Sequence, residues 1–331
     1  MNNITFSPNE EEYKNFHLKQ IKLLQSYEAE NEVLGLLPLR DSRILVYNEI
    51  PEGEDNKSKS MLYVFSPENG FSCDIKKEIN VPSISFFEMS DGNVLINYRV
   101  DHNEIVKIKK DSIELIYSIK DYLSKVEKIG FDKFLIRYKN KDKKIKLRFI
   151  YKIYSYSKEN FFMEKDISEL MDKQKSENIC FINKNEFALS SIQKGFFTGE
   201  NLYINFYDIN SEKIIKSIKI GKTEDADGEM FLANERNLLF NKGYCLYAIV
   251  DVKSKSIIGE VKFPCPNLIF FYLNEKLFLV DGDGPLFLYE LEDQKTYKLK
   301  EQKGGIKHDL IYNYSGNKLV TCDKKKINIY G

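Results

Sequence analysis

The residue types that usually carry catalysis are sparse and scattered in this sequence. The three histidines, His17, His102 and His308, lie far apart along the chain and fall on different predicted strands or loops. Nucleophilic catalysis needs a base within hydrogen-bond reach of a serine or cysteine, and no local motif pairs such groups. His308 precedes Asp309 at the start of a predicted strand, where a structural histidine is the simpler interpretation. The sequence therefore predicts a protein that is not an enzyme and that carries no cofactor.

One glycine-rich segment could bind a phosphate or a metal ion. Asp281-Gly282-Asp283-Gly284 has two glycines, but a dinucleotide-binding motif needs a third glycine and a following helix. Asp281 and Asp283 have the spacing with which a calcium loop begins, although the remaining oxygen ligands and the closing glutamate are missing. A hairpin loop is the favoured interpretation, and no metal site is predicted.

Charged loops are candidates for binding a partner. A basic stretch between Arg137 and Arg148 contains Lys139, Lys141 and Lys143, and acidic loops contain Asp225 with Asp227 and Asp281 with Asp283. Lysine-rich loops can bind nucleic acid or anionic lipid, but here aromatic residues alternate with the charges, as in a sheet hairpin. We expect these loops to contact other proteins, with RNA or a lipid surface as the third-ranked alternative.

Two further segments resemble recognition elements. Phe196 and Phe197 lie in a loop between Gly195 and Gly199, and exposed aromatic residues often dominate binding interfaces. Either both rings are exposed to a partner or one folds back over the sheet, and the sequence leaves both open. In the insertion 166–177, Ile167, Leu170 and Met171 have helical spacing; such a face packs more often on its own sheet than on a partner.

These loops separate copies of one repeated unit. A strand rich in aromatic and β-branched residues recurs seven times, beginning near Met61, Asn103, Lys146, Asn201, Tyr244, Pro285 and Lys325. Successive copies are 40–43 residues apart, with one interval of 55, and a period of about 40–45 residues is that of a propeller blade. Three further strands fit each unit, for example 178–183, 186–191 and 213–220 around the copy at 201–208. The sequence predicts an all-β, seven-bladed β-propeller of four-stranded blades.

The chain ends just after its seventh anchor strand, so the last blade is one strand short. The segment His17 to Tyr27 alternates suitably to supply that strand, and closure would remove the unpaired edge of an open array. We therefore predict a flexible polar tail over 1–16 and a single propeller domain over 17–331.

With these repeats, the chain resembles the WD40-repeat family over nearly its full length. The Trp-Asp pair that ends the third strand in that family is matched by Tyr207-Asp208, Val250-Asp251 and Tyr289-Glu290. The sequence contains no tryptophan and no Gly-His dipeptide, so the polar network of the family is absent or rebuilt. The resemblance implies a propeller that serves as a docking platform.

Composition bears on partners and location. The 50 basic and 50 acidic side chains cancel, which removes any global attraction to nucleic acid or acidic lipid. The five cysteines are scattered without a Cys-x-x-Cys pair, the first residues are polar and acidic, and no apolar run is long enough for a membrane span. These features favour a cytoplasmic protein in a reducing compartment.

The sequence thus favours a non-enzymatic protein-interaction scaffold, a subunit or adaptor of a larger assembly. The alternative is a catalytic or small-ligand-binding propeller that uses the central channel. Strand order places the loops after the second and fourth strands on one face of a WD40-type disc, and all the candidate loops follow such strands.

Overall fold

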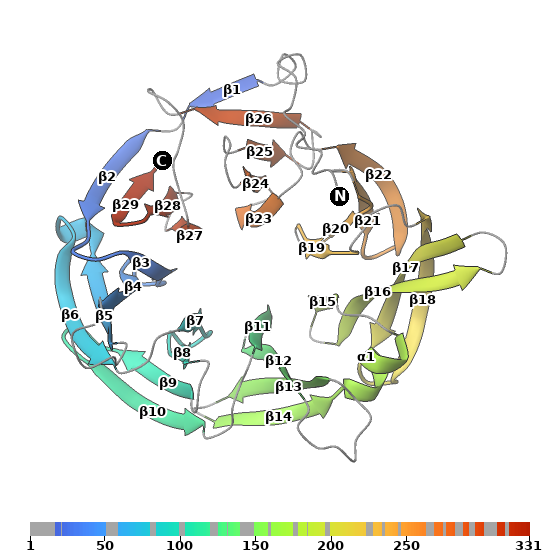
Figure 1. Ribbon diagram of the computed structural model, residues 1–331, viewed down its shortest axis with the longest axis horizontal. Coiled ribbons are helices and arrows are strands. Elements are labelled where there is room, and N and C mark those ends of the chain that lie inside the picture. Colours follow the sequence, from blue (N-terminus) through green and yellow to red (C-terminus); the bar gives the residue numbers. More distant parts are fainter. Residues whose placement is uncertain are drawn as a thin grey trace, which may run out of the picture. The chain divides into compact units, whose positions relative to one another are not determined.

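The chain folds into consecutive sheets in the computed structural model, and their strands pair antiparallel except for one parallel pair (Figure 1). Six of the sheets in the described part have four strands and one has five. The described residues are 17–331 without 21, 51–58, 80–83, 99–102, 120–124, 131, 140–148, 158–159, 175–177, 184, 196–198, 223–227, 234–235, 244–245, 263–267, 274–275, 282–286, 291–294, 301–309 and 315–317. The prediction of an all-β fold is confirmed.

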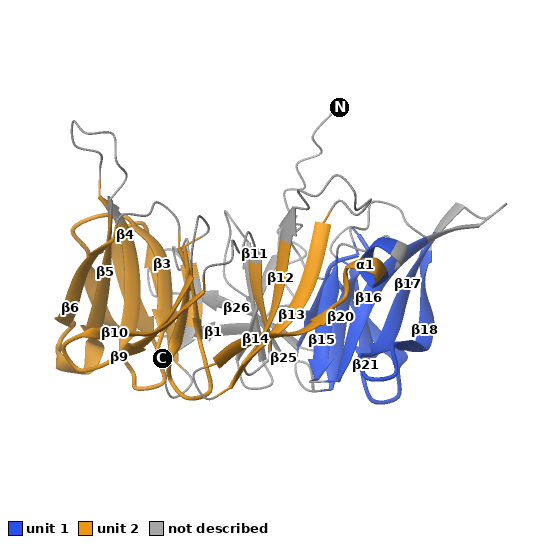
Figure 2. Cartoon of the chain, turned by 90° about the horizontal axis from the view of Figure 1, so that it is seen from below, with its two compact units in different colours: residues 1–21, 170–306 blue, residues 22–169, 307–331 orange. Residues whose placement is uncertain are grey.

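The chain groups into two compact units, 1–21 with 170–306 and 22–169 with 307–331 (Figure 2). The second unit contains four sheets. Their strands are β2 (Leu23–Glu28), β3 (Val33–Pro38), β4 (Ile44–Ile50), β5 (Lys59–Ser66), β6 (Ser72–Ile79), β7 (Ser85–Glu88), β8 (Val94–Asn97), β9 (Asn103–Ile108), β10 (Ile113–Ile119), β11 (Lys125–Gly130), β12 (Lys133–Lys139), β13 (Phe149–Ser157), β14 (Asn160–Asp166), β27 (Leu310–Tyr314), β28 (Lys318–Asp323) and β29 (Lys326–Tyr330). A short 3-10 helix, Pro67–Asn69, follows β5.

The first unit contains three sheets. Their strands are β1 (His17–Gln20), β15 (Ile179–Asn183), β16 (Glu186–Gly195), β17 (Gly199–Asp208), β18 (Lys213–Lys222), β19 (Met230–Leu232), β20 (Asn237–Asn241), β21 (Leu246–Asp251), β22 (Ser256–Lys262), β23 (Leu268–Leu273), β24 (Lys276–Asp281), β25 (Phe287–Glu290) and β26 (Lys295–Lys300). The helix α1 (Ser168–Gln174) lies in sequence between β14 and β15. The third strand of every sheet coincides with an anchor copy of the predicted repeat.

The core of each unit lies between neighbouring sheets, and the second strand of a sheet serves both of its faces. Along β4, Ile44 and Val46 pack into a cluster with the β27–β29 sheet, whereas Leu45 and Tyr47 pack into a cluster with the β7–β10 sheet. All four side chains are buried. Because successive side chains of a strand point to opposite faces, a strand between two neighbours must be apolar at every position. This explains the continuous apolar runs of the repeat.

The same arrangement continues through both units. Val94 and Ile96 of β8 pack toward the β3–β6 sheet, while Leu95 packs with Phe134 of the β11–β14 sheet. In the first unit, Phe206 joins a cluster with the β19–β22 sheet. Phe134 and Phe206 are fully buried, so these clusters hold neighbouring sheets together.

The N-terminal segment predicted as one strand forms two. Leu23–Glu28 (β2) pairs antiparallel with β29, so that Tyr27 lies opposite Ile327. His17–Gln20 (β1) instead pairs parallel with β26, as the fifth strand of the β23–β26 sheet. The two strands thus belong to different sheets, and only the second half of the predicted segment completes the last sheet. The amides of Lys22 and Gly331 each donate to the other's carbonyl oxygen at the end of this pairing.

Candidate functional site

Two turns between the first and second strands of successive sheets have the same hydrogen bonds. In the turn 39–43 the Asp41 carboxylate accepts the amide of Arg43 at 3.1 Å, and in the turn 89–93 Asp91 accepts the amide of Asn93 at 3.0 Å. In each turn the backbone amide of the first residue donates a hydrogen bond to the carbonyl of the last residue. Both bonds, Leu39 to Arg43 and Met89 to Asn93, are 2.8 Å long. Aspartate favours such turns because its side chain can bond the backbone two residues on.

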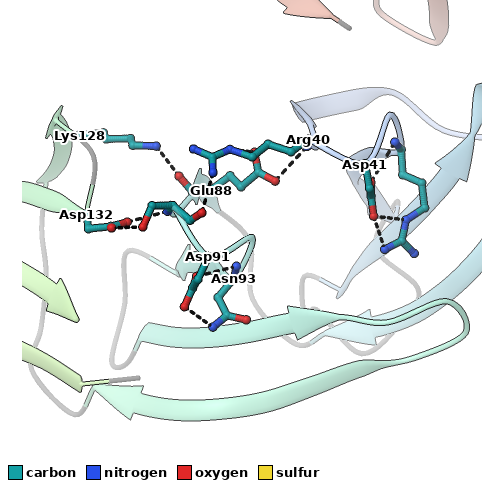
Figure 3. A network of polar contacts seen from close by, with 9 residues as sticks. Arg40, Asp41, Glu88, Asp91, Asn93, Lys128 and Asp132 are labelled. Atoms are coloured by element: carbon teal, nitrogen blue, oxygen red, sulfur yellow. Dashed lines mark hydrogen bonds and ion pairs between the residues drawn. The ribbon is translucent and has the colours of Figure 1, made fainter. Parts of the chain in front are cut away.

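Side chains from these turns connect three consecutive sheets (Figure 3). Arg40 donates through its amide to Glu88 Oε1 at 2.9 Å and through Nη1 to the carbonyl of Ser90 at 2.6 Å. Ser90 in turn donates through its amide to Asp132 Oδ1 at 2.7 Å, and its hydroxyl donates to the same carboxylate. Lys128 donates to the carbonyl of Glu88. We call these five residues the turn cluster: Arg40, Glu88, Ser90, Lys128 and Asp132.

Further contacts extend the links on both sides of the turn cluster. Arg43 donates to the carbonyls of Lys109 and Ile108 at 2.6 and 3.0 Å. The Tyr314 hydroxyl donates to the carbonyl of Ser42 at 2.6 Å, which ties the last sheet to the β3–β6 sheet. The Tyr156 hydroxyl donates to Asp91 Oδ2 and accepts from Asn93 Nδ2, both at 2.8 Å.

Partial burial shifts the titration of two members of the turn cluster. Burial raises the pKa of the Glu88 carboxyl, against the opposing effect of the Arg40 amide and guanidinium. Burial also lowers the pKa of the Lys128 ammonium. The donors and acceptors shown in Figure 3 are directed at turn backbone and at one another. The chemistry of this cluster is therefore that of an inter-sheet clamp.

The aspartates at the end of the third strand cap the following turn. Asp208 accepts the amide of Ser211 at 2.6 Å, and Asp251 accepts the amide of Ser254 at 2.7 Å. Asp251 also accepts from Arg236 Nε at 2.6 Å, and this hydrogen bond, with the Ser254 contacts, holds the pKa of Asp251 well below its usual range. These are positions matched to the Trp-Asp pair, where the sequence left open whether the polar network is absent or rebuilt. At Asp251 a polar contact is present, and its donor is an arginine from the turn between the first two strands.

The predicted partner-binding residues lie largely outside the described residues. Lys139 is the last residue of β12 and pairs with Phe149, and Asp281 is the last residue of β24 and pairs with Leu268. The other seven lie outside: Lys141, Lys143, Phe196, Phe197, Asp225, Asp227 and Asp283. Each of the loops follows the second or fourth strand of its sheet, as predicted. Lys139 and Asp281, the two that the structure describes, belong to different sheets.

The insertion after β14 has the predicted helix. Ile167 and Met171 are buried, with 4% and 1% of their surface exposed, and the Ile167 amide donates to the carbonyl of Tyr151 in β13 at 2.9 Å. The helical face is therefore covered by the chain itself. This agrees with the interpretation that we favoured from sequence.

Other groups that could react or bind metal contribute no site among the residues described. His17 begins β1, while His102 and His308 lie outside. Cys73, Cys180 and Cys322 are free thiols, and within the described ranges no three His, Cys, Asp or Glu side chains are grouped to hold a metal ion. No helix in that part of the chain has the length and apolar character needed to cross a membrane.

The turn cluster was not predicted from the sequence. Its members come from three different sheets, and the sequence of one turn or strand end gives no sign of which neighbour it contacts. The matching turn sequences Leu39–Arg43 and Met89–Asn93, which share only an aspartate in the middle, are the one signal that could have identified equivalent turns.

Comparison with known proteins gives the fold a name. No family model matches the chain, and no curated protein matches its sequence. Among solved structures, the crystal structure of the WD40 beta propeller domain of Doa1 is similar, with a TM-score of 0.53 over 94% of this chain and 97% of that one. Identity is 9%, so the similarity concerns the fold alone. Together with consecutive four-stranded sheets, it shows that the chain has a WD40-like β-propeller fold.

Proposed function

We propose that residues 17–331 form one closed propeller of seven blades, in which β2 completes the last blade. The antiparallel pairing of β2 with β29 supports this proposal. The Ser26 hydroxyl adds a side-chain contact to that pairing, because it donates to Asn328 Oδ1 at 2.8 Å across 302 positions of sequence. Closure by strands from both ends of the chain protects the sheet edge that an open array would expose.

We further propose that this propeller is a non-enzymatic scaffold that binds other proteins in the cytoplasm, as a subunit or adaptor of a larger assembly. WD40-like propellers generally serve as interaction scaffolds, although a fold by itself does not fix a function. The observation that carries the proposal for this chain is the hairpin formed by β16 and β17.

This hairpin continues past the first strand of its sheet. β15 pairs with β16 only as far as Ile179 opposite Leu189, whereas β18 accompanies β17 to Asn201, and β16 and β17 remain paired to Gly195 opposite Gly199. Ile192, beyond the end of β15, has 48% of its surface exposed. Phe196 and Phe197 follow directly in sequence, so the paired end of the hairpin leads to two adjacent aromatic residues. A hairpin end of this kind suits the insertion of an aromatic anchor into a partner.

The charged loops complete the proposed docking face. The segments with Lys139, Lys141 and Lys143, with Asp225 and Asp227, and with Asp281 and Asp283 all follow second or fourth strands. In a WD40-type disc such connections share one face with the β16–β17 loop. Basic and acidic loops on that face would select a partner by charge complementarity.

The double substitution Phe196→Ala, Phe197→Ala tests the docking role. Truncating a buried phenylalanine costs about 3–5 kcal/mol of stability, whereas losing a binding hot spot costs about 2 kcal/mol or more of affinity. We expect the melting temperature to stay within a few degrees of the parent while the principal partner is lost. The measurement is thermal unfolding together with quantitative affinity capture from the native cytoplasm.

A matched control replaces an exposed apolar residue elsewhere. Leu115 on β10 has 54% of its surface exposed, and Leu115→Ala should change neither stability nor capture. A large fall in melting temperature of the phenylalanine variant would show that the rings belong to the core. An unchanged set of captured proteins at unchanged stability would place the docking surface elsewhere.

A further inference from the structure

The outer strand of the β15–β18 sheet combines several lysines with exposed apolar residues. β18 reads KIIKSIKIGK, with lysine at 213, 216, 219 and 222 and no acidic residue. Ile214 and Ile215 have 44% and 50% of their surface exposed. Lysine at exposed edges usually prevents unwanted strand pairing, but two adjacent exposed isoleucines on the same strand do not serve that purpose.

One edge of β18 is open in the part of the chain that the structure describes. β17 pairs with one side of β18, and no described strand pairs with the other. Bulges leave Ile215 and Ile220 without a partner in β17. Between the bulges, Lys216 to Lys219 pair regularly with Phe206 to Tyr203. In a regular stretch, backbone groups that do not bond one neighbour point toward the other side, so this stretch can accept another strand.

The lysines of β18 whose side chains the structure describes are not neutralised along the strand. Lys216 Nζ donates to the carbonyl of Ser254 at 3.1 Å, and neither Lys213 nor Lys219 forms an ion pair with any described residue. The outer strand β22 of the neighbouring sheet also exposes Ile257 and Ile258, but it differs in charge because it contains Glu260, which pairs with Lys242. A strand edge with uncompensated lysines repels another copy of itself and favours an acidic segment.

The chain itself provides an example of a strand added at an outer edge. β26 is the outer strand of its sheet, reads KTYKLK, and pairs in parallel with β1 from His17–Tyr297 to Gln20–Lys300. An extended segment from elsewhere thus forms a fifth strand on a lysine-rich outer strand of this fold. β18 is longer than β26 and carries the same type of charge.

We propose that the outer edge of β18 binds an extended, acidic segment of a partner protein, in which Asp or Glu alternates with apolar residues, as a fifth strand of the sheet. Main-chain hydrogen bonds would supply affinity, as in other cases of strand addition, and the lysines and isoleucines would select the sequence. This inference rests on the proposed scaffold role and names the chemistry of one partner segment.

Selection from a library of random decapeptides displayed on phage, with the full chain as bait, tests the proposal. We expect the enriched peptides to alternate acidic and apolar residues. The best peptide, made synthetically, should bind about tenfold more weakly to the Lys213→Glu, Lys219→Glu variant. The control is Lys77→Glu, Lys326→Glu, which makes the same change in net charge at exposed lysines of other sheets and should bind like the parent.

A backbone-methylated form of the same peptide tests strand pairing directly. Methylation of alternate amides removes the hydrogen bonds of one peptide edge, so binding should be lost when the methylated edge faces β18. Failure to enrich acidic peptides, equal weakening in the control variant, or full binding of both methylated forms would each overturn the proposal. If the Lys213→Glu, Lys219→Glu variant still captures every native partner, the strand site is wrong while the scaffold role stands.

Discussion

The equivalent turns 39–43 and 89–93 each contain one residue in the left-handed backbone conformation, and the type of that residue differs between them. Ser42 has φ of 66° and Gly92 has φ of 81°, in turns with matching hydrogen bonds. A residue with a Cβ atom is strained in this conformation, which lowers the stability of the fold. Glycine is not strained there, but it has more conformational entropy in the unfolded chain, which also lowers stability. The aspartates before them, Asp41 and Asp91, can be identified from the sequence as turn formers. Which of the two turns is strained can be determined only from the backbone angle φ in the structure.

Exchanging the residue types at these two positions should move stability in opposite directions. Ser42→Gly should raise the free energy of unfolding by about 0.5–1 kcal/mol, since relief of a cost of about 1–2 kcal/mol is partly offset by chain entropy. Gly92→Ala should lower it by about 1 kcal/mol, through backbone strain alone because a Cβ there would meet no atom within 4 Å. Denaturant unfolding of both variants measures this, and a shift of the same sign in both would contradict it.

Asp251 should make stability depend on pH. Its pKa is depressed in the folded state by the hydrogen bond from Arg236, so its contribution is present above the unfolded-state value of about 3.9 and is lost as pH falls through the folded-state value. Asp251→Asn should therefore be less stable than the parent at neutral pH, with a difference that narrows below about pH 4. Melting temperatures from pH 7 downward test this.

Arg236→Gln provides the matched variant for that experiment, since it removes the other partner of the same bond. It should show the same narrowing. If the difference in melting temperature between the parent and Asp251→Asn stayed constant down to the lowest pH measured, the charge of the Asp251 carboxylate would contribute nothing to stability.

At the scale of elements, the sequence specified strands better than the contacts between turns. The strand 213–220, predicted from its density of β-branched residues, is observed as Lys213–Lys222, because such a run between polar turns has few alternatives. The division of 17–27 into β1 and β2 could not be predicted, since polar and apolar residues alternate equally well in both halves. The two strands differ in the sheet that each one joins. The turn cluster was missed for a related reason, because Arg40 and Glu88 meet only when two sheets are stacked.

Deleting the two N-terminal strands separately should have different effects. Loss of Leu23–Glu28 exposes the edge of β29 and removes Tyr27, whose ring packs on Phe65 and Phe71, so we expect aggregation. Loss of His17–Gln20 removes only a fifth strand and should leave a folded monomer, and loss of residues 2–12 should have no effect. Size-exclusion chromatography with light scattering distinguishes these cases. Equal tolerance of all three deletions would rule out β2 as the closing strand.

At the scale of the whole molecule, the proposed single domain requires the two compact units to unfold together. The clusters of apolar residues that join one sheet to the next are of the same kind in both units. In the proposed closed ring each blade would be packed between two neighbours, so partial unfolding at one blade would destabilise the next. The 40–43-residue period indicated such an arrangement because each unit of the repeat is too small to bury its own faces.

Calorimetry with one core variant in each unit tests this cooperativity. Phe65→Leu and Phe206→Leu each place a smaller side chain at a fully buried position, one in each unit. We expect a single heat-absorption peak that moves to lower temperature as a whole in either variant. Two peaks, of which each substitution moves only one, would mean that the units are separate domains.

The pairing of β2 with β29 also bears on how the protein is synthesised. During synthesis β2 must wait for its partner until β29 has been made, because Ser26 and Asn328 are 302 positions apart. At about 5–20 residues per second this delay lasts roughly 15–60 s. Throughout that time the nascent chain carries β2 without its partner strand. Chaperones that hold nascent chains should therefore stay bound until β29 has been made, and a stop codon placed just before β29 should yield a product that is degraded rather than one that accumulates.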